Sequence, residues 1–224
     1  MAVSDSPEPE DIAYTGQQLE CFCAAVESIR ARGIDPGIVH AANTGAVAFH
    51  KESWFDMVRP GILLYGYAPA DSEKKPAMAV KPLMELQSAL VFIKEVKKGA
   101  FISYGKTWAA GENTLIGTIP LGYGDGLSRM LSNNWRIAAA SQAGDRQVSD
   151  NQNAESFLRP LVGRICMDQC MVDLGKSSGA RRWDPVTIFG GIAPHAGIMA
   201  SRLNTIPYEI TCNINKRVPR VYID

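Results

Sequence analysis

The sequence predicts an α/β region followed by an all-β region, and three observations support this division. Up to residue 68, segments whose apolar residues recur at helical intervals alternate with short apolar runs that are typical of buried strands. This alternation is typical of a parallel α/β sheet or barrel. From residue 77 onward, segments rich in β-branched and aromatic residues are separated by Gly, Asn, Asp and Pro, which indicates a mostly antiparallel β domain. The polar stretch at 69–76 is bounded by prolines and is expected to be a linker. The predicted organisation is therefore 1–68, 69–76 and 77–224.

The first region is expected to begin with an amphipathic helix over 15–32. Thr15 is a candidate N-cap and Gly33 a stop signal. The apolar positions recur every three or four residues: Leu19, Phe22, Cys23, Val26 and Ile29. After this helix, short buried strands are predicted at 37–40 and 57–59, with a small helix at 45–50 between them. This alternation suits a parallel α/β sheet or barrel.

The second region contains six segments with the composition of strands. They are 86–96, 115–121, 161–172, 185–189, 208–214 and 218–223. The stretch at 141–155 is too hydrophilic for a core and is predicted to be a long hairpin loop.

Composition excludes several classes of function. Lys plus Arg and Asp plus Glu both number 23, so the chain lacks the positive charge expected of a nucleic-acid-binding protein. No apolar run approaches the roughly 20 residues that a membrane helix needs, and the acidic, Pro-rich start is unlike a signal peptide. We therefore expect a cytoplasmic protein with neither a nucleic-acid partner nor a membrane partner.

The five cysteines are odd in number and scattered, which predicts reduced thiols instead of a disulfide framework. The pairs at 21–23 and 166–170 raise the question of a zinc site. Neither pair has the spacing of a structural zinc site, and the three histidines lie far apart in the sequence. No metal site is expected.

Two short segments have residues suited to an anion. Asn43, Thr44 and Gly45 follow a predicted strand and open a helix, and the segment at 60–62 follows the next strand. In a parallel α/β fold, both would place backbone N–H groups at the C-terminal ends of strands. Such segments taken alone are usually only turns.

Five motifs in a fixed order extend this pattern over the chain. They are HAANT at 40–44, VRPGI at 58–62, ISYG at 102–105, GRICMDQ at 163–169 and TIPYE at 205–209. In order and spacing they resemble alanine racemase, a pyridoxal-phosphate (PLP) enzyme of fold type III. The resemblance implies that 1–68 are the C-terminal strands and helices of a (β/α)₈ barrel and that 77–224 are the β domain after it. It matches no lysine here to the one that binds the cofactor, so we expect an incomplete chain that is inactive alone.

The resemblance also implies contacts with PLP. Thr44, Gly61 and Ile62 would bind the phosphate beside Asn43, and Thr44 keeps the hydroxyl of the serine that is common at this position. Tyr208 would also reach the phosphate. Arg59 would face the pyridine nitrogen. A guanidinium can only donate, so that nitrogen would stay unprotonated and the ring would be a weaker electron acceptor.

For the substrate, the resemblance implies that Tyr104 is the base on one face of the reacting carbon and belongs to the other subunit of a dimer. The backbone N–H of Met167 would meet the substrate carboxylate. The residues implied to line the entrance are Tyr123, Arg129, Arg164, Ile206 and Tyr208. The tyrosines would restrict the entrance to alanine, and the arginines would attract its carboxylate.

The implied function is the interconversion of L-alanine and D-alanine for peptidoglycan. The implied partner is a second copy in a head-to-tail homodimer, or a racemase N-terminal segment that complements this chain. Two alternatives stay open: a non-catalytic fragment that binds a racemase subunit, and a serine/alanine racemase domain of a glycopeptide-resistance type. The intact Tyr208 favours alanine over serine.

Overall fold

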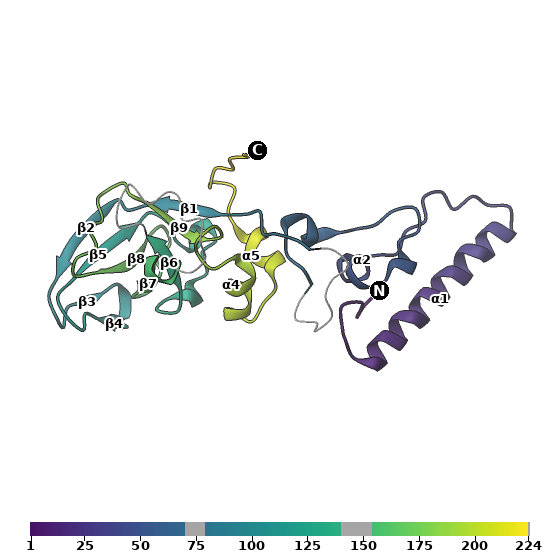
Figure 1. Cartoon of the computed structure of the whole chain (residues 1–224), viewed down its shortest axis with the longest axis horizontal. Coiled ribbons are helices and arrows are strands. Elements are labelled where there is room, and N and C mark those ends of the chain that lie inside the picture. Colours follow the sequence, from purple (N-terminus) through teal and green to yellow (C-terminus); the bar gives the residue numbers. More distant parts are fainter. Residues whose placement is uncertain (70–78, 140–153, 224) are drawn as a thin grey trace. The chain divides into compact units, whose positions relative to one another are not determined.

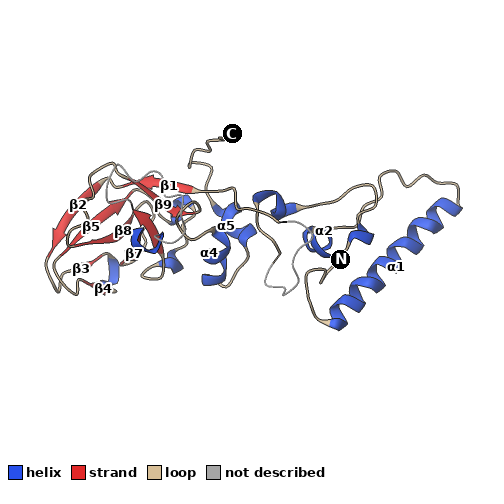
Figure 2. Cartoon of the chain, viewed as in Figure 1, coloured by secondary structure: helices blue, strands red, loops and turns tan. Residues whose placement is uncertain are grey.

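The computed structural model describes residues 1–69, 79–139 and 154–223, which divide into two compact units, Met1–Leu83 and Met84–Asp224 (Figure 1). Most of the predicted linker at 69–76 and of the predicted hairpin loop at 141–155 lies outside the described residues. The fold class is the predicted one, because helices and turns make up the first unit and an antiparallel sheet dominates the second (Figure 2).

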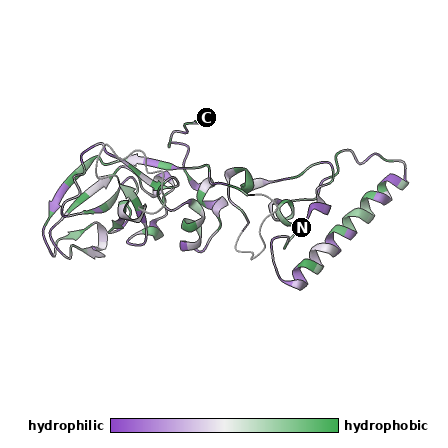
Figure 3. Cartoon of the chain, in the orientation of Figure 1, coloured by the Kyte–Doolittle hydropathy of each residue, from purple (hydrophilic) through white to green (hydrophobic). Residues whose placement is uncertain are grey.

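Helix α1 (Pro9–Ala31) begins earlier than the sequence predicted. Glu8 occupies the N-cap position, Pro9 stands at the start of the helix, and two acidic residues in the first turn complement the helix dipole. Thr15 is therefore not the N-cap but a buried residue inside the helix. The stop at Gly33 is confirmed, since this residue has a φ of 73° just beyond the helix end. Hydrophobic and hydrophilic residues share α1 along its length (Figure 3).

After α1, two extended segments run in the same direction. The amide of Asp56 donates to the Val39 carbonyl at 3.0 Å, and the amide of Arg59 donates to the Ala42 carbonyl at 3.0 Å. The predicted strands at 37–40 and 57–59 are nevertheless wrong, because neither segment is a strand. A parallel ladder repeats its bonds every two residues, and these two bonds lie three residues apart, so the pairing does not continue.

The predicted small helix at 45–50 is confirmed as α2 (Thr44–Phe49), and two 3₁₀ turns, η1 (Lys51–Ser53) and η2 (Gly61–Tyr65), follow it. The apolar side chains of these elements make a small core. Its buried members are Ala42, Ala46, Val47 and Leu63. This core holds the starts of α2 and η2 in place.

In the described part of the second unit, seven strands form one antiparallel sheet in the order β1-β9-β6-β7-β8-β5-β2, and β3 pairs with β4 separately. The strands are β1 (Leu86–Ala89), β2 (Phe92–Val96), β3 (Phe101–Ile102), β4 (Trp108–Ala109), β5 (Thr114–Ile119), β6 (Arg136–Ala139), β7 (Leu158–Val162), β8 (Cys170–Gly175) and β9 (Pro185–Phe189). The predicted strands at 115–121 and 185–189 are confirmed as β5 and β9. Because β1 and β2 follow each other in the chain yet stand at opposite ends of this order, the sheet curls to bring its edges together.

Two long predicted strands are interrupted. The segment 86–96 divides into β1 and β2, which pair with β9 and β5 respectively. The segment 161–172 breaks after β7, where Gly163 has a φ of 72° that a strand does not accommodate. The loop at 163–169 then separates β7 from β8.

The remaining elements of the second unit are short helices and 3₁₀ turns. They are η3 (Tyr104–Lys106), η4 (Tyr123–Asp125), η5 (Arg129–Leu131), α3 (Ala154–Phe157), α4 (Ala196–Arg202) and α5 (Pro207–Asn213).

The predicted strand at 208–214 is wrong, because α5 occupies these residues. Pro207 stands at the start of the helix, and Ile210 and Ile214 are buried four residues apart, which is helical spacing. The predicted strand at 218–223 is also absent. Its last three residues are more than 80% exposed and pair with no strand among the described residues. No helix in the described ranges combines the length and apolar character needed to cross a membrane.

Candidate functional site

Asn43 caps α2 and fastens the N-terminal segment to it. Its Oδ1 accepts from the Ala46 amide at 3.1 Å and from the Ser4 hydroxyl at 2.7 Å, while Nδ2 donates to the Met1 carbonyl at 2.9 Å. The packing here is close, since a Cβ on Gly45 would lie 2.7 Å from the Ser4 Oγ.

Thr44 brings the two predicted anion segments together. Its hydroxyl donates to the Pro60 carbonyl at 3.1 Å, which places the start of α2 beside the start of η2. The backbone amides of Gly45, Gly61 and Ile62 donate to no acceptor among the described residues. Unused donors at two neighbouring helix starts are the groups that an anion requires.

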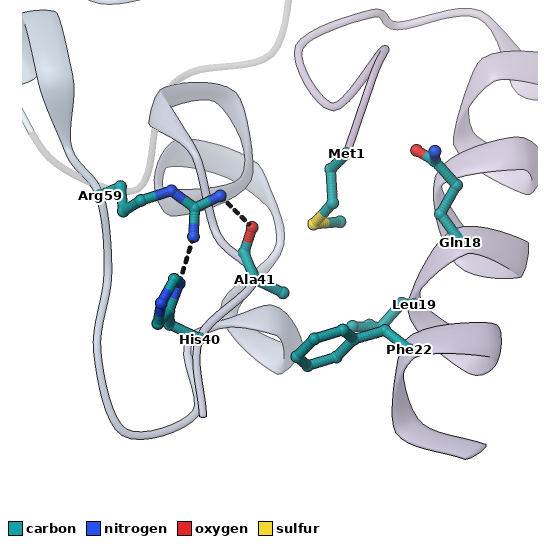
Figure 4. Close-up of a pocket in the computed structure, with 7 residues that line it drawn as sticks. All are labelled: Met1, Gln18, Leu19, Phe22, His40, Ala41 and Arg59. Carbon is teal, nitrogen blue, oxygen red and sulfur yellow. Dashed lines mark hydrogen bonds between the residues drawn. The ribbon is translucent and has the colours of Figure 1, made fainter. Parts of the chain in front are cut away.

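The guanidinium of Arg59 is held by two contacts in the same unit (Figure 4). Its Nη1 lies 2.5 Å from His40 Nδ1, and Nη2 donates to the Ala41 carbonyl at 3.0 Å. Since the guanidinium can only donate, Nδ1 of His40 is the acceptor. These residues line a hollow of about 370 Å³, to which α1 contributes Gln18, Leu19 and Phe22.

Tyr104 lies in a tight turn directly after β3. Positive φ values at Ser103 (64°), Gly105 (73°) and Lys106 (50°) reverse the chain here. Ile102 before the turn is buried, whereas Tyr104 is 73% exposed. The turn thus presents the phenol to solvent and does not pack it in a core.

Met167 lies in the loop between β7 and β8 and is 54% exposed, so it is not a buried filler residue in a strand. The Cys166 carbonyl accepts from the Tyr123 amide at 3.0 Å, and the Met167 carbonyl accepts from the Gly124 amide at 2.8 Å. A Cβ on Gly122 would lie 2.2 Å from the Cys166 oxygen and 2.4 Å from the Met167 oxygen. Only glycine at position 122 allows this close docking.

The turn and the loop line one open hollow of about 700 Å³ in the second unit. Its lining residues are Ser103, Tyr104, Tyr123, Cys166, Met167, Asp168, Gln169 and Met171. The structure therefore brings together three predicted residues, Tyr104, Tyr123 and Met167.

The other predicted entrance residues lie elsewhere in this unit. Arg164 packs beside the Tyr104 turn, where its Nε would lie 3.1 Å from a Cβ on Gly105. Arg129 is exposed in η5, and Ile206 and Tyr208 lie at the N-cap and in the first turn of α5. Among the described residues, the lining of the 700 Å³ hollow includes none of these.

Arg217 is a residue that sequence reasoning missed. Its Nη2 donates to Asp168 at 2.7 Å and its Nε to Asp125 at 2.7 Å, and these bonds raise the pKa of Arg217. The three residues are far apart in the sequence, so no local pattern indicated the cluster. The only local hint was the acidic residue next to Met167, which is able to pair with a cation but is exposed enough to need none.

Cys170 lies at the start of β8, just after the loop. Burial raises the pKa of its thiol to about 12, and the nearby Cys166 and Asp125 add to the effect. Among the described residues all five cysteines are free thiols.

Comparison with known proteins identifies the family. The family model "Alanine racemase, C-terminal domain" matches residues 83–222, and "Alanine racemase, N-terminal domain" matches residues 1–69. The chain belongs to the alanine racemase family.

Individual racemases match along the whole chain. The alanine racemase of Treponema denticola is 44% identical over 230 residues, which cover 100% of this chain and 56% of that protein. The solved alanine racemase of Clostridium difficile 630, in complex with cycloserine, has a TM-score of 0.83 at 32% identity and is matched over 97% of this chain and 53% of its own. The one from Streptomyces coelicolor A3(2) has a TM-score of 0.83 at 33% identity and is matched over 100% of this chain and 55% of its own. The chain therefore spans about half the length of these alanine racemases.

Proposed function

We propose that this chain is the C-terminal part of a PLP-dependent alanine racemase, which interconverts L-alanine and D-alanine for peptidoglycan. One observation carries the proposal: Tyr104 and Met167, far apart in the sequence, line one hollow in a member of this family. The proposed organisation is the end of the barrel at 1–68, a linker at 69–76 and the β domain at 77–224.

The first unit has groups that fit the phosphate of PLP. The proposed contacts in this unit are the Gly61 and Ile62 amides and the Thr44 hydroxyl, whose proton would turn from the Pro60 carbonyl to the phosphate, and Asn43 fixes the start of α2. Tyr208 of the second unit keeps the phosphate role that the resemblance implies. Support comes from the unused amides at two neighbouring helix starts.

Arg59 is proposed to face the pyridine nitrogen. The contacts with His40 and Ala41 fix its guanidinium, so its remaining N–H groups have a set direction. When bound, PLP supplies an electron-withdrawing ring that makes the Cα proton of an amino acid more acidic. A donor-only partner leaves that ring a moderate electron acceptor, which favours proton exchange over side reactions.

For the substrate, the Tyr104 hydroxyl is proposed to move the proton on one face of the reacting carbon, and the Met167 amide to bind the carboxylate. The exposed position of both residues supports this, because each is available to a second copy of the chain in a homodimer. The proposed entrance residues are Tyr123, Arg129, Arg164, Ile206 and Tyr208. The free cysteines support a cytoplasmic location, where thiols stay reduced.

The test is complementation. The chain is mixed with PLP and the N-terminal segment of a related alanine racemase, and D-alanine is measured by chiral chromatography. We expect no turnover and no borohydride-sensitive PLP absorbance band with the chain alone, and turnover with both parts. Binding of the two parts without turnover would contradict the proposal and favour the non-catalytic alternative.

A further inference from the structure

We propose that Ser103 is a positioning residue for Tyr104, which it orients by fastening the Tyr104 turn to the loop that carries Met167. This inference rests on the proposed function, in which Tyr104 moves the proton and Met167 binds the carboxylate.

The backbone of Ser103 is strained. Its φ of 64° and ψ of −175° lie in a region that is occupied essentially only by glycine. A residue with a side chain keeps such dihedrals only when surrounding contacts hold it there. Contacts of Ser103 must therefore offset the strain of its backbone.

The contacts that hold Ser103 come from the other loop. Its hydroxyl donates to the Arg164 carbonyl at 2.6 Å and lies 3.7 Å from the Cys166 sulfur. Gly163 permits this approach, since a Cβ there would lie 2.7 Å from the Ile102 oxygen and 2.8 Å from the Ser103 Cβ. The Tyr104 turn and the start of the Met167 loop are thus in direct contact through Ser103.

Asn133 adds a second link between the same two segments. Its Oδ1 accepts from the Gly163 amide at 2.6 Å, and its Nδ2 donates to the Thr107 hydroxyl at 3.2 Å. The neighbouring Ser132 hydroxyl accepts from the Ile165 amide at 3.0 Å. Hydrogen bonds from Asn133 and Ser132 therefore hold both the Tyr104 turn and the start of the Met167 loop.

Tyr104 depends on this anchoring because its own side chain makes no hydrogen bond among the described residues. On one side, Ile102 is buried in a cluster with Val96 and Ile116. Ser103 follows Ile102, and its backbone dihedrals set the direction in which the chain continues into Tyr104. Loss of the Ser103 hydroxyl should therefore loosen the Tyr104 turn and the Met167 loop together.

The first experiment measures amide hydrogen exchange in the full chain and compares Ser103→Ala and Ser103→Gly with a control variant, Ser88→Ala. Ser88 is a half-buried strand residue whose side chain makes no hydrogen bond among the described residues. Loss of one hydrogen bond should raise exchange in both 101–107 and 163–168 by about three- to tenfold. The control should leave both segments unchanged. Faster exchange at 101–107 alone would overturn the coupling.

The second experiment uses the chain complemented with an N-terminal racemase segment. Ser103→Ala should lower kcat by about tenfold with a smaller change in KM, and by less than about twofold when Tyr104 is already Phe. An equal loss in both backgrounds would overturn the positioning role. If Ser103→Ala does not fold, Ser103→Gly repeats the cycle without backbone strain. Full activity of Tyr104→Phe itself would instead refute the proposed function, while the exchange experiment would still test Ser103.

Discussion

Arg217 donates to Asp168 at 2.7 Å, and so contacts the residue that follows Met167 in the loop. The same guanidinium donates to Asp125 at 2.7 Å in η4. Gly124 leaves room for it, since a Cβ there would lie 2.5 Å from Nη2. One residue near the C-terminus therefore joins the two segments whose backbones dock on each other at the hollow.

Replacing Arg217 should loosen both segments. Arg217→Gln removes the positive charge. Arg217→Lys keeps the charge, but a single ammonium group cannot bond both Asp125 and Asp168 as the planar guanidinium does. We expect faster amide exchange at 122–126 and 166–169 in both variants, and a higher KM for alanine in the complemented enzyme. Arg181→Gln is the control, because no described residue accepts from its side chain. Unchanged exchange in Arg217→Gln would show that the backbone bonds alone hold the loop.

Gly122→Ala should destabilise the β domain. Its Cβ would lie 2.2 Å from the Cys166 carbonyl oxygen, so the backbone of one segment must move. We expect a loss of unfolding free energy of about 2 kcal/mol or more, measured by thermal or urea unfolding. Gly111→Ala is the matched control, because a Cβ there meets nothing within 4 Å. Equal stability of the two variants would contradict the close docking of the Met167 loop.

The strands that the sequence predicted well are those in which most side chains are at least partly buried, such as β5 and β9. The segment at 161–172 looked like one strand because apolar residues recur throughout it, but the chain turns at Gly163, where φ is positive, and a loop follows before β8. The segment at 208–214 looked like a strand because it contains β-branched and aromatic residues and its apolar residues alternate with polar ones, yet helical burial of Ile210 and Ile214 decides its conformation. Tertiary contacts outweighed local propensity in each case.

The candidate site was predictable only through motifs. Local patterns selected Tyr104 and Met167, whose neighbouring sequence carries the resemblance. The contacts that hold them, through Ser103 and Arg217, join residues 49 to 92 positions apart, and no periodicity records such pairs.

Tyr104→Phe tests the proposed proton transfer. The substitution removes the hydroxyl from one face of the reacting carbon only. In the complemented enzyme we expect racemisation to slow by about two to four decades in at least one direction, with PLP binding nearly unchanged. The measurement is the initial rate from each alanine enantiomer, with a PLP titration as control. Equal activity of the variant in both directions would refute the assignment.

Tyr208→Ala tests the proposed entrance and the choice between alanine and serine. The phenol is about one-third exposed in the first turn of α5. Removing the ring should admit serine relatively better than alanine, and losing the hydroxyl should weaken PLP binding by about 0.5 to 1.5 kcal/mol. Competition kinetics with both amino acids, run beside a PLP titration, measure the two effects. If neither the preference for alanine over serine nor the affinity for PLP changed, Tyr208 would have a packing role only.

The pKa of Cys170 predicts a loss of stability in alkali. Burial raises it to about 12 from an ordinary value of 9.0, so the folded chain keeps this proton where the unfolded chain loses it. The contribution of the protonated Cys170 thiol to the free energy of unfolding is fully present below pH 9. It is lost between about pH 9 and 12, by up to about 1.4 kcal/mol per pH unit. Urea unfolding of the wild type and Cys170→Ala over this range gives the difference. If the free energies of unfolding of the wild type and of Cys170→Ala changed equally with pH over this range, the prediction would be wrong.

The pairing of β1 with β9 joins residues about 100 positions apart. During synthesis, the first strand of the sheet must therefore wait for the last, a delay of about 5 to 20 s at ordinary elongation rates. Until then β1 is an open edge that can recruit other chains. A ribosome that stalls before residue 189 would release a product with that edge unprotected, so the demand for chaperones should fall on nascent chains and not on the finished domain.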